Sequence, residues 1–275
     1  MPGDGVLGLA AWEWLQYGFM RQALLAVVLL SWLFGLAGSM VVNARMAFFS
    51  DAIGHAALTG IAIGSLLGLG NPLWAMLLFS IFLALAIVWV RRVAAASIDT
   101  VIALFMALAV AWGVMILSRG GGFNKYTRYL IGDILGISPQ DLLGLAILAL
   151  AATAVFYVTY NRIALTGFNS SWARSRGLKV GLWQGLFAAM VAAIVTVSIQ
   201  WVGVLVVNSM LILPAAAARN LAADVRAYVW LTVALSLISG VVGLIASYYW
   251  ATASGATIVI VAMGFFLLSL ICKRR

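Results

Sequence analysis

Long apolar runs, separated by short polar or glycine-containing segments, follow one another along almost the whole chain. About 20 apolar residues are needed for a helix to cross roughly 30 Å of hydrocarbon, and nine runs reach about that length. They lie at residues 21–43, 48–69, 72–91, 98–118, 139–160, 180–199, 202–221, 227–248 and 254–272. The pattern predicts an all-α, polytopic membrane helix bundle of about nine transmembrane helices, with eight as the alternative, in a single transmembrane domain over residues 1–275.

Composition agrees with this pattern. The chain is 65% hydrophobic and 8% charged, and its mean hydropathy is +1.15, which is typical of membrane proteins in contact with lipid. The net charge of +9 does not indicate nucleic-acid binding, because the basic residues stand at the ends of apolar runs instead of forming a patch. The single Cys272 excludes an intrachain disulfide and a thiolate metal site. The opening MPGDG lacks the basic region of a signal peptide, so we expect no cleaved leader.

The basic residues also predict the orientation. If the segment 161–179 is cytoplasmic and the spans alternate in direction, twelve lysines and arginines face the cytoplasm and four face outward, as the positive-inside rule requires. The cytoplasmic set is Arg45, Arg91, Arg92, Arg162, Arg174, Arg176, Lys179, Arg219, Arg226, Lys273, Arg274 and Arg275. The C-terminus is then cytoplasmic, and the glycine-led loop 119–138, which we expect to hold a short helix, is extracytoplasmic. The N-terminal orientation reverses if residues 1–20 or 119–138 also cross.

Asp51 and His55 are the first candidates for a functional site. They lie four residues apart in the run FFSDAIGHAALTGIAIG, so an α-helix places both side chains on one face. An oxygen and an imidazole nitrogen at this spacing can hold one divalent cation. Ionisable groups within a membrane are costly and usually functional, although a buried pair that only packs the bundle is the alternative. Ser50 and Thr59 are further candidates to line a pathway.

Small residues on the same run indicate that this helix is central. Gly60, Gly64 and Gly68 have the spacing of a close-packed helix face. Asp51 follows Arg45 by six residues, a rise of roughly 9 Å, which favours a position nearer the inner face.

A second informative stretch is GVLVVNSMLILPAAAARNLA, from Gly203 to Ala222. Pro214 lies inside its apolar run, where proline frees a backbone carbonyl and tends to kink a helix. Asn208 and Ser209 precede it by one to two turns and are candidates to line a polar pathway. Many membrane helices carry a kink with a nearby amide, so packing is the simpler interpretation of this stretch alone.

The sequence argues against several classes of function. It contains no GxxxxGK[ST] run, so ATP hydrolysis would have to come from another subunit. A secondary carrier or channel would need its own coupling-ion site or a continuous polar pore, and Asp51 is the one carboxylate well inside a predicted span. A metalloprotease would require two histidines and an aspartyl protease two membrane carboxylates.

Four blocks together resemble the permease subunit of ABC transporters for zinc, manganese and iron. The blocks are DAIGHAALTG, IGDILGIS, GVLVVNSMLILPAAAARNLA and SGATIVIVAMGFFLLSL, and the likeness extends from about Ala37 to Leu270. The resemblance implies an importer in a bacterial or archaeal cell membrane. Its parts would be two permease copies, identical or paralogous, two cytoplasmic ABC ATPase subunits and an extracytoplasmic metal-binding solute-binding protein. No cofactor would be bound permanently, and the transported ion would be Zn²⁺, Mn²⁺ or Fe²⁺.

The resemblance also assigns roles to residues of this chain. Asp51 and His55 match the DxxxH block on the family's metal pathway. The segment from about Gly167 to Gly177 matches the coupling helix that docks on the ATPase. Its candidate coupling residues are Gly167, Phe168, Asn169, Trp172, Ala173, Arg174 and Gly177.

The chain departs from the family pattern at several positions. Thr59 replaces a frequent proline, Gly54 a frequent serine, and Asn169 a common acidic residue. Asn208 and Ser209 stand where serine and alanine are usual. The segments SIDT at 97–100 and SGATIV at 254–259 are more similar to zinc permeases than to manganese permeases, which favours zinc. Asp99 is interpreted as a residue of the first helical turn, where an anion is favourable.

Overall fold

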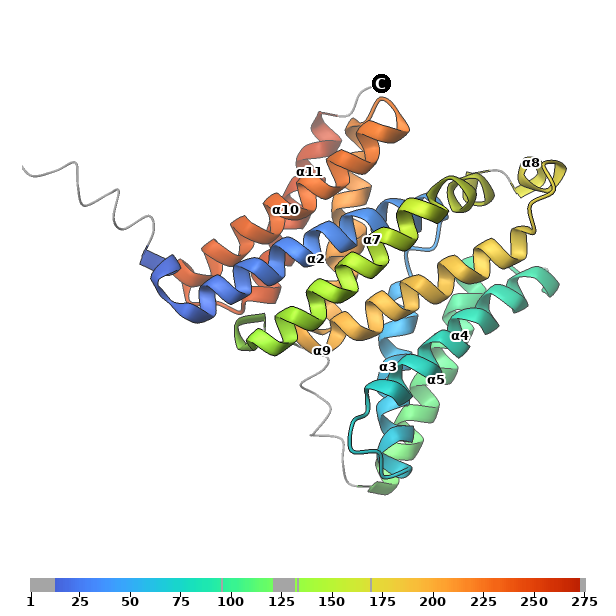
Figure 1. The fold of residues 1–275 in the computed structure, drawn as a ribbon, viewed down its shortest axis with the longest axis horizontal. Helices are drawn as coiled ribbons and strands as arrows, with labels where there is room; N and C mark the ends of the chain where they lie inside the picture. Colours follow the sequence, from blue (N-terminus) through green and yellow to red (C-terminus); the bar gives the residue numbers. More distant parts are fainter. Residues whose placement is uncertain (1–12, 95, 121–131, 133, 169, 273–275) are drawn as a thin grey trace, which may run out of the picture.

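The computed structural model describes residues 13–94, 96–120, 132, 134–168 and 170–272, and these residues form helices and turns without a strand. Figure 1 shows the arrangement. The elements are η1 (Glu13–Gln16), α2 (Gly18–Asn43), α3 (Phe49–Leu66), α4 (Leu73–Val93), α5 (Ile98–Gly120), η2 (Ile134–Gly136), α7 (Pro139–Phe168), α8 (Ser170–Ser175), α9 (Val180–Leu221), α10 (Val225–Trp250) and α11 (Ser254–Ile271).

The expected spans are confirmed in the described part of the chain. Seven of its helices are long and apolar enough to cross a membrane. One of the seven, α9, has a non-helical backbone at Gly203 and therefore supplies two successive segments. α3 is less apolar than the seven because it carries Asp51 and His55. Six unbroken helices, the two segments of α9 and α3 together make the nine helices that the hydrophobic pattern predicts.

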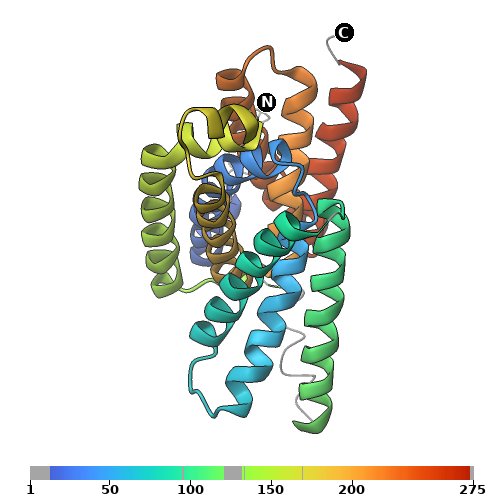
Figure 2. The same ribbon diagram turned by 90° about the vertical axis from the view of Figure 1, so that its right-hand side faces the viewer.

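Helix α9 contacts both of the two groups into which the other long helices fall. It packs against α2, α7, α10 and α11 on one side and against α3 and α4 on the other. α5 packs mainly on α3, which it covers from the outside of the second group. Figure 2 shows α3, α4 and α5, coloured light blue to green, extending below the other helices. The contact between the two groups therefore depends on the path of α9.

The path of α9 is set by a break at Gly203. A straight helix of 42 residues would be roughly 63 Å long, about twice the hydrocarbon thickness. At Gly203 the backbone adopts φ 77° and ψ 165°, a region that only glycine occupies readily. Gly132 lies against this bend, since a Cβ atom placed there would be 2.1 Å from the carbonyl carbon of Val202. The break lies at Gly203, and helical structure continues through Pro214, where a kink stays a prediction.

The start of α7 is fixed by local hydrogen bonds. Ser138 and Asp141 form a reciprocal cap, in which the Asp141 amide donates to Ser138 Oγ at 3.2 Å and the Ser138 amide donates to Asp141 Oδ2 at 3.1 Å. The other carboxylate oxygen accepts a hydrogen bond from Trp201 Nε1 at 3.1 Å. The cap of α7 thereby holds the residues that precede the break in α9.

Two predicted connections differ from the structure in extent. α7 continues to Phe168, so the first part of the predicted loop 161–179 is helical. The reason is that Ile163 and Thr166 are buried and extend the packed face of α7 by two turns. In the segment 119–138, the expected short helix is the 3₁₀ turn η2, while residues 121–131 and 133 lie outside the described part of the chain.

The three glycines assigned to helix packing have two different roles. A Cβ atom at Gly60 would lie 2.6 Å from Met76 Cα, and one at Gly64 would lie 3.0 Å from Ala75 Cβ, so both allow α3 to approach α4. Gly68 lies beyond the end of α3 with φ 66°. Its amide donates to Ser65 O and the Leu69 amide donates to Gly64 O, which is a Schellman turn. Gly68 therefore ends the helix instead of packing it.

We expect Gly203→Ala to destabilise the protein by about 1–3 kcal/mol, because alanine is strained at a positive φ with an extended ψ. The measurement is thermal unfolding of the purified chain in detergent. Gly264→Ala is the matched control, because Gly264 lies within α11 and has no neighbouring atom within 4 Å of the added Cβ position. Equal melting temperatures for the two variants would contradict the role given to Gly203.

Candidate functional site

Asp51 and His55 share one face of α3, as the spacing predicts. His55 Nε2 and Asp51 Oδ1 are 3.9 Å apart, and the two side chains keep 32% and 36% of their surface exposed. This is too long for a strong hydrogen bond, so the pair does not fully satisfy itself. Both side chains are therefore partly accessible, and each keeps an atom that could serve as a ligand to a metal ion.

The structure brings the two informative stretches of the sequence together at this point. Asn208 Nδ2 in the second segment of α9 donates a hydrogen bond of 2.7 Å to Asp51 Oδ1. The side-chain oxygen of Asn208, Oδ1, is buried, and no described residue donates a hydrogen bond to it. Asn208 is thus more than a packing residue near a kink, because its amide is the direct partner of the membrane carboxylate.

The contact with Asn208 gives the position of the pair along α9. Asn208 is about 6 Å of helix rise from Val204 and roughly 20 Å from Leu221. The pair therefore lies nearer to the Gly203 break than to the end of α9. Arg45 stands in a turn with φ 56°, so the helical rise expected between Arg45 and Asp51 does not describe this connection; α3 begins near the middle of the molecule (Figure 1).

Gly54, between the two candidate ligands, sets the distance between α3 and α9. A Cβ atom at this position would lie 2.9 Å from Val204 Cγ1 and 3.6 Å from Ile199 Cδ1. A serine at this position, which is frequent in the permeases that the sequence resembles, would require Val204 to move. The small residue allows the helix carrying Asp51 and His55 to lie directly against the broken part of α9.

The other candidate pathway residues occupy different surroundings. Ser50 is buried and its hydroxyl donates to Ala47 O at 3.4 Å in the preceding turn. Thr59 is buried and its hydroxyl donates to Ala109 O, which ties α3 to α5. Ser209 is partly buried beside Asn208, and Pro214 is buried within the second segment of α9. The structure thus brings Asn208, but neither Ser50 nor Thr59, into hydrogen-bond contact with Asp51.

The described residues contain no group of three or more His, Cys, Asp or Glu side chains that could hold a metal ion. One chain offers the Asp51 carboxylate, the His55 imidazole and, as a neutral oxygen donor, the Asn208 amide. Such a set suits borderline divalent ions. With one carboxylate and one imidazole it is less complete than the four-ligand cages that retain zinc permanently.

The predicted coupling segment forms a separate feature. α8 is a six-residue helix, and its residue Ala173 is fully buried. Trp172 is largely exposed and carries the Arg176 guanidinium 4.3 Å above its ring, while Arg174 Nε donates to Ser170 O. Gly167 is exposed, and Gly177 ends the turn with φ 75°. The side chain of Phe168 and all of Asn169 lie outside the described part of the structure.

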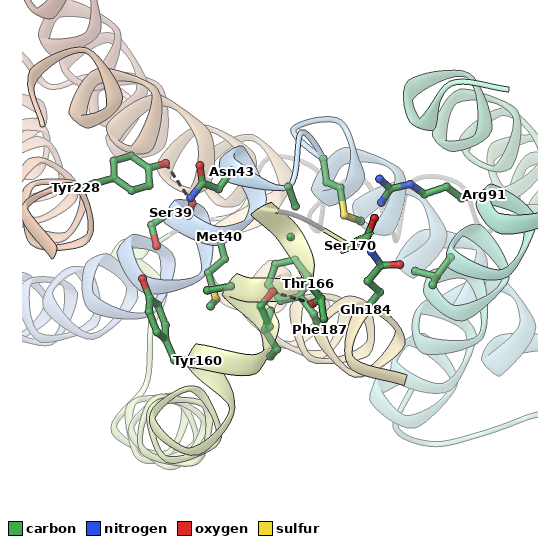
Figure 3. Close-up of a pocket in the computed structure, with 16 residues that line it drawn as sticks. Ser39, Met40, Asn43, Arg91, Tyr160, Thr166, Ser170, Gln184, Phe187 and Tyr228 are labelled. Carbon is green, nitrogen blue, oxygen red and sulfur yellow. Dashed lines mark hydrogen bonds between the residues drawn. The ribbon is translucent and has the colours of Figure 1, made fainter. Parts of the chain in front are cut away.

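A polar cavity of about 140 Å³ was not anticipated from the sequence. It lies where the ends of α2, α4 and α7 meet the starts of α9 and α10, and Figure 3 shows its lining. Tyr228 donates to Ser39 O at 3.1 Å on one side, and Arg91 lies near Ser170 and Gln184 on the other. The lone Gln184 in an apolar run was the one sequence signal available, because the remaining lining residues come from distant segments.

Comparison with known proteins gives a consistent set of similarities. The sequence profile of the ABC 3 transport family matches residues 16–273. The high-affinity zinc uptake system membrane protein ZnuB of Haemophilus influenzae is 30% identical over 267 residues, which cover 94% of this chain and 100% of that protein. The manganese transport system membrane protein MntC of Listeria innocua is 30% identical over 256 residues, covering 93% and 91% of the two chains.

A solved structure shares the fold. The structure described as PsaBC from Streptococcus pneumoniae in complex with Fab is similar over 96% of this chain and 95% of that chain, with a TM-score of 0.82 and 23% sequence identity. The all-helical arrangement described above is therefore found in a solved structure.

We expect Asp51 and Asn208 to be energetically coupled. In a double-mutant cycle of Asp51→Ala and Asn208→Ala, the coupling free energy should be about 1.5–3 kcal/mol, since the bond involves a charged acceptor. Thermal unfolding in detergent measures it. A cycle of Asp51→Ala with Ser209→Ala is the control, because the structure describes no hydrogen bond between Ser209 and Asp51. Additive effects in the first cycle would show that the contact contributes nothing.

Proposed function

Because the chain belongs to the ABC 3 transport family, we propose that it is the membrane-spanning permease of an ATP-driven importer for a divalent transition-metal ion. The single observation that best supports a metal as cargo is the accessible Asp51–His55 pair, hydrogen-bonded to Asn208 beside the break in α9. A pair that served only packing would be expected to be buried and mutually satisfied. This pair is neither.

The proposed role of each side chain follows from its chemistry. Asp51 and His55 offer one carboxylate oxygen and one imidazole nitrogen as transient ligands to the ion. Asn208 acts as a positioning residue, because its amide holds Asp51 Oδ1 in a fixed orientation. Few ligands suit a transport site, which has to release its ion after binding it.

A second copy of the permease completes the assembly in this proposal. Two protein ligands from one chain leave most coordination positions of a transition metal to water or to another chain. The partly exposed face of α9 that contains Asn208 and the exposed Leu205 lies next to the pair. We infer that the equivalent face of a second chain approaches it, as a homodimer or as a pair with a paralogue.

The energy source and the delivery of the ion are assigned to other subunits. The chain has no phosphate-binding GxxxxGK[ST] run, so a cytoplasmic ATPase dimer would supply hydrolysis and dock on α8. An extracytoplasmic solute-binding protein would deliver the ion at the opposite end, where α9 breaks. The distribution of lysine and arginine supports a cytoplasmic C-terminus in the cell membrane.

Zinc is the metal we favour. The candidate ligands suit zinc, manganese and ferrous iron alike, and a site with an imidazole nitrogen binds zinc more tightly than manganese in the general affinity order. The segments at 97–100 and 254–259 support the same choice. Since the named relatives transport zinc in one case and manganese in the other, manganese is the alternative that the experiment has to test.

We expect His55→Ala and Asp51→Asn each to reduce ATP-dependent zinc uptake at least about tenfold, because each removes a proposed ligand. Uptake is measured in proteoliposomes containing the permease, its ATPase and its binding protein, with zinc and manganese in competition. Ser65→Ala, an exposed position at the far end of α3, is the control. Undiminished uptake by an assembled His55→Ala transporter would refute the ligand role, and preferential manganese uptake would replace zinc.

For the coupling segment, Trp172→Ala should weaken co-purification with the ATPase roughly tenfold or more, since exposed tryptophans at the centre of an interface contribute strongly to binding. Trp74→Ala is the matched control, because Trp74 is also an exposed tryptophan but lies in the first turn of α4, at the other end of the bundle. Equal retention of the ATPase by both variants would remove Trp172 from the docking surface.

A further inference from the structure

Four cationic side chains surround a recess at the end of the bundle that carries α8. Arg91 and Arg92 come from the end of α4, and Arg174 and Lys179 from α8 and the residue before α9. Together they line a cavity of about 700 Å³ that contains no Asp or Glu in its lining. Among the described residues, none of the four has a carboxylate within ion-pair distance. The recess therefore concentrates positive charge that the chain itself does not neutralise.

The recess adjoins the cavity of Figure 3, because Arg91, Ser170 and Gln184 line both. In Figure 3, Arg91 reaches from α4 toward Ser170 and Gln184. These residues add hydroxyl and amide hydrogen-bonding groups beside the guanidinium. Arginine and hydroxyl donors in this combination are suited to phosphate oxygens.

The position of Arg92 depends on a glycine at the start of α9. A Cβ atom at Gly181 would lie 1.5 to 1.9 Å from the guanidinium atoms of Arg92. The guanidinium therefore rests directly on the backbone of α9, and a larger residue at position 181 would displace it. Arg92 remains exposed, and this contact holds its charge beside the start of α9.

Next to the basic recess, α4 and α9 expose apolar side chains. Leu85 and Trp89 on α4 and Leu182 and Leu186 on α9 are exposed large hydrophobic side chains. Leu85 lies next to Gly185, since a Cβ there would be 3.5 Å from Leu85 Cδ2. The two exposed stripes thus adjoin and run from the basic recess toward the middle of the membrane.

We propose that this groove binds an anionic phospholipid of the cytoplasmic leaflet, with its phosphate in the basic recess and its acyl chains along α4 and α9. Basic pockets between transmembrane helices on the cytoplasmic side are suited to acidic head groups. The recess opens onto apolar stripes that bilayer acyl chains contact, so a lipid head group can reach the four cations directly from the membrane. The proposal rests on the chain spanning a membrane with the α8 end at the cytoplasmic face, and it does not rest on metal transport.

Native mass spectrometry of the full-length chain in a neutral detergent tests the proposal. The chain is titrated with phosphatidylglycerol, phosphatidylcholine and, separately, inorganic phosphate. We expect phosphatidylglycerol to bind at least about tenfold more tightly than phosphatidylcholine. The double variant Arg92→Gln/Lys179→Gln should lose most of that preference, because each basic residue near the surface contributes to binding an anionic lipid. Arg21→Gln/Arg226→Gln removes the same charge elsewhere and should retain the preference.

A second variant separates the recess from net charge. Gly181→Ala keeps all four cations but displaces Arg92, so it should also weaken phosphatidylglycerol binding. Equal binding of the two lipids by the unmodified chain would overturn the proposal without any variant. It would also be overturned if inorganic phosphate bound as tightly as the lipid, or if the double variant kept the preference for phosphatidylglycerol.

Discussion

The hydrogen bond between Asn208 and Asp51 joins an amide on α9 to a carboxylate on α3 inside a largely apolar bundle. A carboxylate in such surroundings is costly unless it has a hydrogen-bond partner or a cation. Asn208 supplies a partner for one oxygen at 2.7 Å, while His55 remains at 3.9 Å. The arrangement stabilises an ionisable residue on α3 without satisfying it fully, which leaves it able to interact with an ion.

This contact depends on the shape of α9. The break at Gly203 turns the chain so that Asn208 and Val204 face α3. Gly54 allows the approach, and Gly132 and the Ser138–Asp141–Trp201 hydrogen bonds support the bend from the other side. Because α9 also connects the two groups of helices, a movement of one group relative to the other would act directly at the Asp51 site. In the proposed transport cycle, such a movement would change the access of the ion to Asp51.

The sequence was a good guide wherever local chemistry decides the structure. Apolar runs predicted the spans, and the four-residue spacing placed Asp51 and His55 on one face. Features that depend on distant segments were missed or misplaced. Pro214 offered a local reason for a kink, but no local pattern indicated the break at Gly203, against which the distant Gly132 packs. The position of Asp51 depends on its contact with Asn208 of α9, and the buried position of Thr59 depends on its hydrogen bond to α5. The cavity around Tyr228 and Gln184 is assembled from several helices and has no local pattern.

The most direct test of the central claim is zinc-edge X-ray absorption of the assembled transporter, loaded with zinc and its binding protein and held by an ATPase variant that does not hydrolyse ATP. We expect nitrogen and oxygen ligands at about 2.0–2.2 Å, with an imidazole contribution. That contribution from the permease should disappear in His55→Ala. A spectrum unchanged by His55→Ala and Asp51→Asn would contradict the claim that this pair holds the transported ion.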